Sequence, residues 1–305
     1  MRPTTGLLLL IAFSVLILSG CESENTTVPF KSDRVPLVTQ LTSNNEVFEA
    51  NPMYSPDGAW ILFESDVTGN RDIWRMPATG GEAQQLTSYE GFDSAPYWSP
   101  DGTRVVFESD RSGFKNIWIL DVTAPLADPI QLTSGSWDDA DPVWSPDGAL
   151  IAHESNRDKD HGTDIWVSPV DGGPAIRLTT TGDGIYHRTA DWSPDGTRLV
   201  FESNRGDGYS ALHTMPAVGG PVTSITPSSG YEGHPAWSPD SEEIVYESKL
   251  TGVMEIYSIP AGGGQPYQVT TGGGFWPRYS PDGTSIIYCV FGDPEPNIWA
   301  VEVDW

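Results

Sequence analysis

The chain has 305 residues, of which 38% are hydrophobic and 12 are Trp, which is enough to fill a packed core. Its 42 Asp and Glu residues outnumber its 16 Lys and Arg residues and give a formal net charge of -26, spread along the chain. Such a surface repels polyanions, so nucleic acid is excluded as a partner, and cations or basic proteins are favoured.

The first 20 residues have the pattern of an export signal. Arg2 is followed by an apolar run from Leu7 to Leu18, which is too short to stay in a bilayer as a spanning helix. The next residues, Leu18-Ser19-Gly20-Cys21, resemble the bacterial lipobox. This resemblance implies that Cys21 becomes the lipid-modified first residue of a mature lipoprotein, whose acyl chains anchor it stably. We therefore expect a membrane-anchored protein of the bacterial cell envelope, facing the periplasm or the cell surface. The sequence leaves open which membrane carries it.

Residues 21–35 are polar, contain Pro and show no periodicity, so we expect a tether between lipid and fold. Cys289 is the second and last cysteine. With Cys21 lipidated it has no disulfide partner, and stability has to come from packing.

A repeat then fills the rest of the chain. Each copy holds an aromatic residue, a turn tetrapeptide, a strand-like run such as "RVVFES", an Ile-Trp pair or a relative of it, and a Leu-Thr pair or a relative of it. The spacing between copies is 42 to 48 residues, typical of a four-stranded propeller blade. Ser, Pro and Gly occupy the corners that a type I β-turn prefers. The tetrapeptide Ser-Pro-Asp-Gly begins at Ser55, Ser99, Ser145, Ser193 and Ser280, and Ser-Pro-Asp-Ser at Ser238.

The order of these segments predicts how the ring closes. Leu41-Thr42 precedes the first turn, and no such pair follows Trp299. The sixth blade thus lacks an outer strand that the N-terminus can supply, which would remove an open sheet edge. We predict an all-β fold over residues 36–305: a six-bladed propeller of four-stranded antiparallel blades, closed by the N-terminal strand and monomeric. Most Trp residues are expected in the core between blades.

The segment "WSPDGTRVVFESDRSGFKNIWILD" followed by "QLT" resembles the propeller repeat of the TolB family, and the resemblance covers the whole mature fold. It implies binding to an envelope partner. This chain differs from TolB in its lipobox and in having no expected α/β domain before the propeller. Similar blades occur in oligogalacturonate lyases and in propeller peptidases.

Loops that precede the inner strands differ between copies, so we expect specificity there. Five of them carry an aromatic residue followed by an acid or a histidine: Phe48-Glu49, Phe92-Asp93, Trp137-Asp138, Tyr186-His187 and Tyr231-Glu232. The blades would bring them around one channel mouth with a mainly negative field, which suits a cation or a basic peptide; a solvated rim is the alternative. The predicted partner-binding residues are Glu49, Asp93, Asp138, Asp139, His187, Glu232 and His234.

A second acid recurs in the second strand of five blades, at Glu64, Glu108, Glu154, Glu202 and Glu247. Buried like charges need partners, and nearby arginines such as Arg111 and Arg157 or loop amides are expected to supply them.

Binding is favoured over catalysis. The sequence has no Gly-x-Ser-x-Gly elbow and no expected catalytic residue, metal ligand set or cofactor. The expected partner is an envelope protein, contacted through a basic segment. The alternative is a lyase of the oligogalacturonate type that uses a metal near His187 and His234. A purely structural envelope protein is a third possibility.

Overall fold

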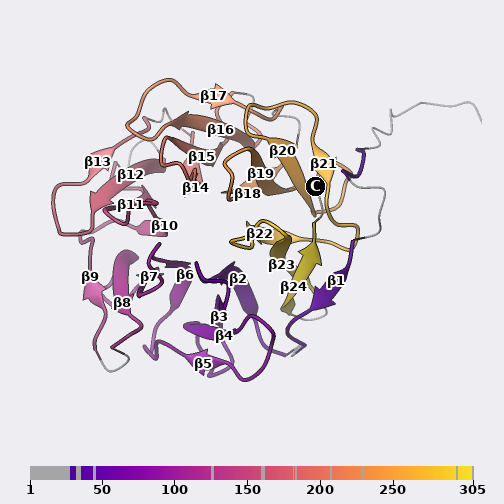
Figure 1. Cartoon of the computed structure of the whole chain (residues 1–305). Helices are drawn as coiled ribbons and strands as arrows, with labels where there is room; N and C mark the ends of the chain where they lie inside the picture. Colours follow the sequence, from indigo (N-terminus) through magenta and orange to yellow (C-terminus); the bar gives the residue numbers. More distant parts are fainter. Residues whose placement is uncertain are drawn as a thin grey trace, which may run out of the picture.

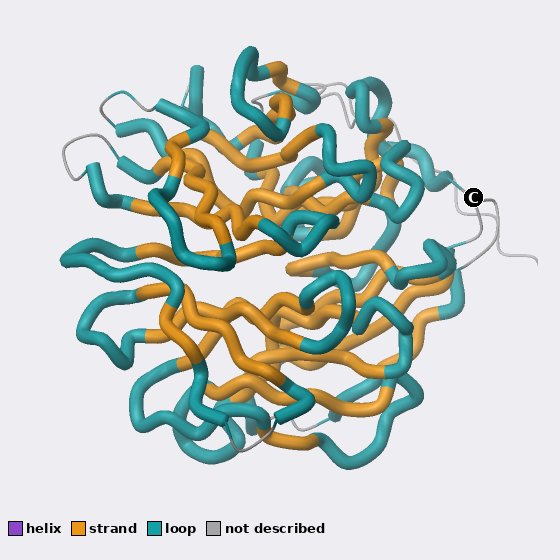
Figure 2. Tube along the Cα trace, turned by 60° about the vertical axis from the view of Figure 1, so that its left-hand side comes forward, coloured by secondary structure: helices purple, strands orange, loops and turns teal. Residues whose placement is uncertain are grey.

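The computed structural model describes residues 28–31, 36–43, 46–124, 127–158, 162–180, 182, 184–206, 208–227, 230–292 and 295–303. The expected signal peptide and Cys21 lie outside these ranges. The described chain forms six antiparallel sheets of four strands each, arranged in a ring around a central channel (Figure 1). Figure 2 shows the loops that join the strands at the two faces of this ring. Within the described ranges, no helix is long and apolar enough to cross a bilayer.

The blades repeat one strand order, from the channel outward. The inner strands are β2 (Glu49–Tyr54), β6 (Asp93–Trp98), β10 (Asp139–Trp144), β14 (His187–Trp192), β18 (Glu232–Trp237) and β22 (Phe275–Tyr279). The second strands are β3 (Trp60–Ser65), β7 (Arg104–Ser109), β11 (Leu150–Ser155), β15 (Arg198–Ser203), β19 (Glu243–Ser248) and β23 (Ser285–Phe291). The third strands are β4 (Asp72–Pro77), β8 (Asn116–Asp121), β12 (Asp164–Pro169), β16 (Ala211–Pro216), β20 (Glu255–Pro260) and β24 (Pro296–Glu302). The outer strands are β5 (Gln84–Gln85), β9 (Ile130–Gln131), β13 (Ile176–Arg177), β17 (Thr223–Ser224), β21 (Tyr267–Gln268) and β1 (Val38–Gln40).

The predicted closure is confirmed. Strand β1 pairs antiparallel with β24 of the sixth blade, with Thr39 opposite Ala300. Just after β1, the Leu41 amide donates to the Ile298 carbonyl at 2.9 Å, and the Thr42 hydroxyl accepts from the Ile298 amide at 3.0 Å. The same threonine contact recurs in every other blade, from third-strand amides to Thr87, Thr133, Thr179, Thr226 and Thr270. The Leu-Thr pair of the repeat therefore fastens the edge of the third strand.

The turn tetrapeptides make the hairpin corners that their residues predict. In the second blade the Gly102 amide donates to the Ser99 carbonyl at 2.9 Å, and the Ser99 hydroxyl donates to Asp101 at 2.6 Å. Asp101 also accepts from the Thr103 amide. These bonds stabilise the carboxylate and lower the pKa of Asp101 to about 2. Six such aspartates lie on one face of the ring, which we call the turn face.

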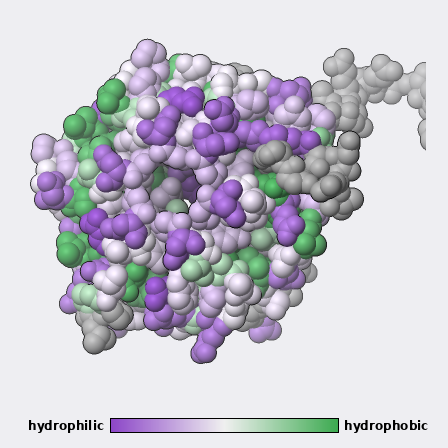
Figure 3. Space-filling model, in the orientation of Figure 1, coloured by the Kyte–Doolittle hydropathy of each residue, from purple (hydrophilic) through white to green (hydrophobic). Residues whose placement is uncertain are grey.

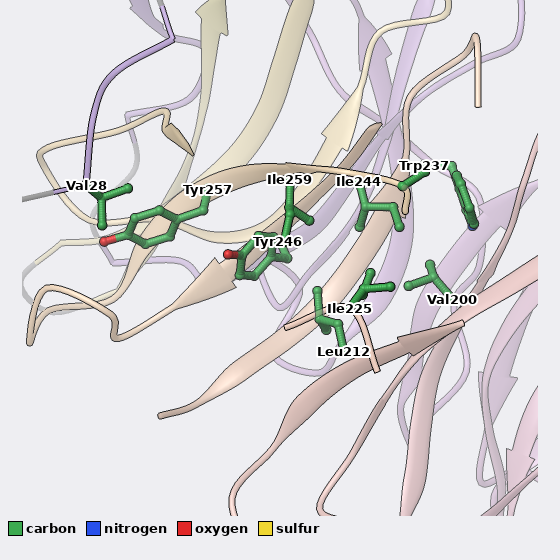
Figure 4. Packing of buried hydrophobic residues seen from close by; sticks show 10 residues of the cluster. Val28, Val200, Leu212, Ile225, Trp237, Ile244, Tyr246, Tyr257 and Ile259 are labelled. Atoms are coloured by element: carbon green, nitrogen blue, oxygen red, sulfur yellow. The ribbon is translucent and has the colours of Figure 1, made fainter. Parts of the chain in front are cut away.

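Apolar side chains from neighbouring blades form the core. Trp98, Trp144, Trp192 and Trp237, which precede the turns, are each at most 6% exposed. The Trp residues of the Ile-Trp pairs are only half-buried. Figure 4 shows one such cluster, in which Trp237 and Ile244 of the fifth blade pack with Val200 of the fourth. Packing between blades thus replaces the disulfides that the chain lacks.

One expectation needs revision. Residues 28–31 belong to the predicted tether, yet they lie against the outer strand of the fifth blade, where Phe30 forms a parallel bridge with Gln268. The remainder of the tether, residues 21–27 and 32–35, lies outside the described ranges and stays a prediction. A polar, Pro-containing segment without periodicity gives no signal for such a short docked stretch.

Candidate functional site

The channel wall is built from a bulge in each inner strand. Every inner strand shifts register against its neighbour midway, as between Ala140 and Val143. At this bulge one residue per blade has a φ of about 46 to 52° and faces the central pocket: Asn51, Ala95, Asp141, Thr189, His234 and Trp276. Holding such residues in the left-handed region costs about 1 kcal/mol or more each, a strain typical of functional surfaces. Five of the six precede Pro, the one sequence signal that could have revealed them.

The recurring glutamates of the second strand hold these bulges in place. Glu64 accepts from the Ala95 amide at 3.0 Å, Glu108 from the Asp141 amide at 3.2 Å, and Glu247 from the Trp276 amide at 2.9 Å. Each bond joins one blade to the next. Backbone amides thus serve three of these acids, but they come from the bulged inner strand of the next blade and not from the loops that were expected.

Arg111 and Arg157, the other expected partners of these glutamates, bind different acids. Arg111 forms two bonds of 2.7 and 2.8 Å with Asp93, and Arg157 bonds Asp139 at 3.0 Å. The prediction failed because the arginine follows the glutamate by three residues and turns back toward the start of the inner strand of its own blade. The cations near the glutamates are Arg71, Lys115 and Arg188, whose side chains are 41 to 47% exposed.

Burial changes the acidity of the glutamates. It raises the pKa of Glu64, Glu202 and Glu232 to about 7, well above the ordinary 4.5. Burial and the neighbouring Asp141 also raise the pKa of Glu154. Glu154 and Glu202 each keep one buried carboxyl oxygen without a hydrogen-bond partner within the described chain. The channel wall therefore takes up protons near neutral pH.

This acidity predicts how stability depends on pH. A carboxyl whose pKa is raised in the folded state stabilises the fold fully below the unfolded value, and that contribution is lost as the pH rises through 7. Wild-type protein should therefore lose unfolding free energy between about pH 5 and pH 8. Glu202→Gln should flatten this fall, whereas Glu82→Gln at an exposed position should not. Urea unfolding across this pH range measures it, and identical profiles for wild type and Glu202→Gln would refute the assignment.

Five of the seven predicted site residues lie together at one end of the channel, the mouth. Glu49, Asp93, Asp139, His187 and Glu232 are the first residues of their inner strands. Four of these are buried, and only Glu49 is partly exposed. The Asp139 side chain accepts from Arg157, and the Glu232 side chain faces the Thr226 hydroxyl. The buried members shape the mouth and meet their partners inside the protein.

Asp138 occupies a place that differs from the one the sequence indicated. Asp139 is the residue equivalent to Asp93, so the aromatic Trp137 lies one residue further out than Phe92 does. Asp138 is partly exposed and accepts from the Lys115 amide of the preceding blade at 3.1 Å. The aromatic-acid pairs in the sequence did not indicate this shift. Trp137 precedes the first residue of β10 by two positions, whereas the aromatic residue of each other pair directly precedes its inner strand.

The two histidines of the lyase alternative have separate surroundings. His187 is buried against Phe201, and burial lowers its pKa to about 4. His234 faces the channel and pairs with Glu247 at 3.0 Å. Among the described side chains, no group of three or more His, Cys, Asp and Glu residues is placed to hold a metal ion.

His234 also links two blades. The Trp276 indole N–H donates to its Nε2 at 3.0 Å, while its Nδ1 faces Glu247. Burial lowers the pKa of His234, but Glu247 outweighs this and raises it to about 9. When His234 is protonated, both of its ring nitrogens carry hydrogen, so Nε2 can no longer accept from the Trp276 indole. Protonation of His234 therefore competes with this hydrogen bond.

Three side chains close the channel on the side of the turn face. Tyr97, Asp191 and Arg278 occupy one equivalent position in alternate blades. Asp191 accepts from the Tyr97 hydroxyl at 3.1 Å and from Arg278 at 2.9 Å, and its other oxygen accepts from the Trp237 amide. These bonds cross the channel. The central pocket, which the bulge residues line, has Tyr97 and Arg278 in its wall, and we call the three bonded side chains the plug.

Exposed apolar residues surround the mouth. The second strands run antiparallel to the inner strands, so the loops that follow them lie at the mouth. In five blades this region presents one large apolar side chain that is 42 to 59% exposed; we call these five the crown: Val67, Phe114, Tyr209, Val253 and Phe291. These side chains occur one to a blade and give this end of the ring its exposed apolar residues. Figure 3 shows one face of the ring, with hydrophilic residues around the central hollow.

These features define a closed six-bladed propeller with a channel open at one end. The TolB beta propeller domain matches residues 83–206 and 185–304, and the chain belongs to that family. Uncharacterized protein Atu1656 of Agrobacterium fabrum is 33% identical over 99 residues, which cover 32% of this chain and 33% of that protein. The matched part is therefore only about a third of that relative's length.

Solved structures share the architecture. A TolB candidate from Agrobacterium tumefaciens is 25% identical, with a TM-score of 0.60 over 68% of this chain and 73% of that one. An oligogalacturonate lyase from Vibrio parahaemolyticus is 13% identical, with a TM-score of 0.63 over 91% of this chain and 96% of that one. At that identity the lyase shares the fold alone.

Proposed function

We propose that this protein is a cell-envelope lipoprotein, anchored through Cys21, whose propeller binds a protein partner at the channel mouth. The observation that carries this proposal is the crown, five exposed apolar side chains at or just after the ends of second strands, on the mouth side of the ring. The opposite end of the channel is closed by the plug, so access is from the mouth. Membership of the TolB propeller family supports binding as the role.

The mouth also suggests the chemistry of the partner. Glu49, Asp138 and His234 are the predicted site residues that keep partly exposed side chains, and Asp141 faces the pocket between them. Behind them lie the buried glutamates, with Arg71, Lys115 and Arg188 as neighbouring cations. A basic segment entering an acidic pocket, with apolar contacts around it, fits this arrangement. Catalysis of the lyase type is not proposed, because His187 is buried apart from His234.

Affinity capture from bacterial envelopes tests the proposal. The double variant Phe114→Ser/Tyr209→Ser removes two crown residues, and we expect it to lose the partner that wild-type protein retains. The control Ile130→Ser/Ile176→Ser removes two even more exposed apolar residues from outer strands of the ring and should retain it. Retention should also weaken as salt rises, because charged contacts are screened. Equal loss in both double variants would argue against the mouth as the binding surface.

A further inference from the structure

The fifth blade carries an addition that the repeat does not supply. Residues 28–31, which we call the strap, lie along its outer strand β21. The Gln268 amide donates to the Pro29 carbonyl at 3.0 Å, and Phe30 bridges to Gln268 in parallel orientation. None of the other five outer strands has a described segment added to it in this way. The strap is therefore a specific contact of the N-terminal segment with one blade.

Side chains of the strap reinforce the backbone contact. Val28 is 9% exposed and packs in the same cluster as Tyr257 of the third strand, as Figure 4 shows. Lys31 forms an ion pair with Glu243 at the start of β19. An apolar residue inserted at one end and a cation paired at the other hold the strap at two points. After the strap the chain continues to β1 on the sixth blade, so the N-terminal segment is attached to two neighbouring blades.

This attachment limits where the ring can sit. The seven Cα–Cα steps from Cys21 to Val28 can span at most about 25 Å, even when fully extended. If Cys21 carries lipid, as proposed above, the outer edge of the fifth blade stays within that distance of the bilayer surface. Without the strap the first fixed point would be β1, and the permitted distance would more than double. The strap therefore keeps one edge of the ring close to the lipid anchor.

The surface near this edge suits a lipid boundary. Phe30, Leu37 and Val38 are apolar and 46 to 59% exposed, and all three flank the attachment to the fifth and sixth blades. The turn face is different, because each blade places an exposed aspartate there, and hydrogen bonds keep these aspartates ionised. An anionic bilayer repels such a face. At the edge with the strap, anchor reach and exposed apolar residues coincide.

We propose that the strap holds the outer edges of the fifth and sixth blades against the membrane, with the bilayer contacting Phe30, Leu37 and Val38. This inference rests on the proposed lipidation of Cys21 and adds an orientation to it. The ring then stands edge-on, and its mouth opens to the side, where a protein partner reaches it without displacing lipid.

Fluorescence quenching on the full-length lipoprotein tests this orientation. The protein is reconstituted into nanodiscs of phosphatidylethanolamine and phosphatidylglycerol that contain a nitroxide-labelled lipid. One fluorophore is attached at Leu37→Cys or, as a matched exposed position on the second blade, at Ile130→Cys; the buried Cys289 does not compete for the label. We expect several-fold stronger quenching at position 37 than at position 130. Equal quenching, or stronger quenching at position 130, would overturn the proposal.

A second variant distinguishes the effect of the strap on orientation from the effect of the lipid anchor by itself. Val28→Asp places a charge in the buried site against Tyr257 and should release the strap, while β1 keeps the ring closed. Quenching at position 37 should then fall toward the value at position 130, with an unchanged melting transition as the check on folding. Unchanged quenching would show that the strap does not position the ring. Mass spectrometry of the Cys21 peptide is read on the same sample, and an unmodified Cys21 would overturn both the anchor and the orientation but not partner capture at the mouth.

Discussion

Replacing residues 37–42 by a Gly-Ser linker of equal length is expected to open the ring and destabilise the whole protein. The linker keeps the backbone groups but lacks the Leu41 and Thr42 side chains and has low strand propensity, so we expect the segment to detach. The backbone bonds from Glu302 to Leu37 and from Leu41 to Ile298 are then lost together with the Thr42 contact. At about 1 kcal/mol each, these three bonds alone stabilise the fold by about 3 kcal/mol. The variant should also expose the edge of β24 and aggregate more readily.

Calorimetry measures this effect. A loss of about 3 kcal/mol should lower the melting temperature of a domain of this size by roughly 5 °C. The same linker in place of residues 22–27, within the predicted tether, is the control and should leave melting unchanged. Thr42→Val alone should have a smaller effect than the linker, since it removes only the hydrogen bond that the Ile298 amide donates to the Thr42 hydroxyl. A linker variant that melts like wild type would mean that β1 does not close the ring.

Asp191→Ala is expected to be the most damaging single substitution in the channel. It leaves the Arg278 guanidinium without its carboxylate and the Trp237 amide without its acceptor, at a 3% exposed position. Removing one partner of a buried ion pair costs about 3 kcal/mol or more. Urea unfolding should show this loss, whereas Asp195→Ala in an exposed turn should cost only about 1 kcal/mol.

The double variant Asp191→Ala/Arg278→Met tests the cause. If the unpaired charge is responsible, removing the guanidinium should restore most of the stability, because the remaining loss comes from two uncharged donors, the Trp237 amide and the Tyr97 hydroxyl. The double variant should also open the channel to small solutes from the turn face. If it is as unstable as Asp191→Ala, the plug does not depend on the ion pair.

The blades and their closure were predictable from sequence because their signals are local and repeated. A Ser-Pro-Asp-Gly corner forms its hydrogen bonds within a few residues, and Leu41-Thr42 supplies the one outer strand that the last blade lacks. The position of the inner strands follows from the same order, since the aromatic residue before four of the six turns is a Trp buried between blades.

The channel was less predictable because its contacts depend on the closed ring. Tyr97, Asp191 and Arg278 are far apart in sequence, and nothing near any of them indicates a partner across the axis. The burial of Asp93 and Asp139 could not be predicted either. An acid beside an aromatic residue is as compatible with an exposed rim position as with a buried ion pair. Local turn chemistry therefore specifies the scaffold, whereas the site depends on contacts between inner strands that differ in sequence and come together only in the closed ring.

Photocrosslinking in living cells tests most directly whether the mouth is the binding surface. A photoreactive amino acid is placed at crown positions Phe114 and Tyr209 and, separately, at turn-face positions Asp101 and Asp195. We expect a common protein partner to be crosslinked from both crown positions and from neither turn position. Crosslinks to that partner from the turn face, with none from the crown, would contradict it.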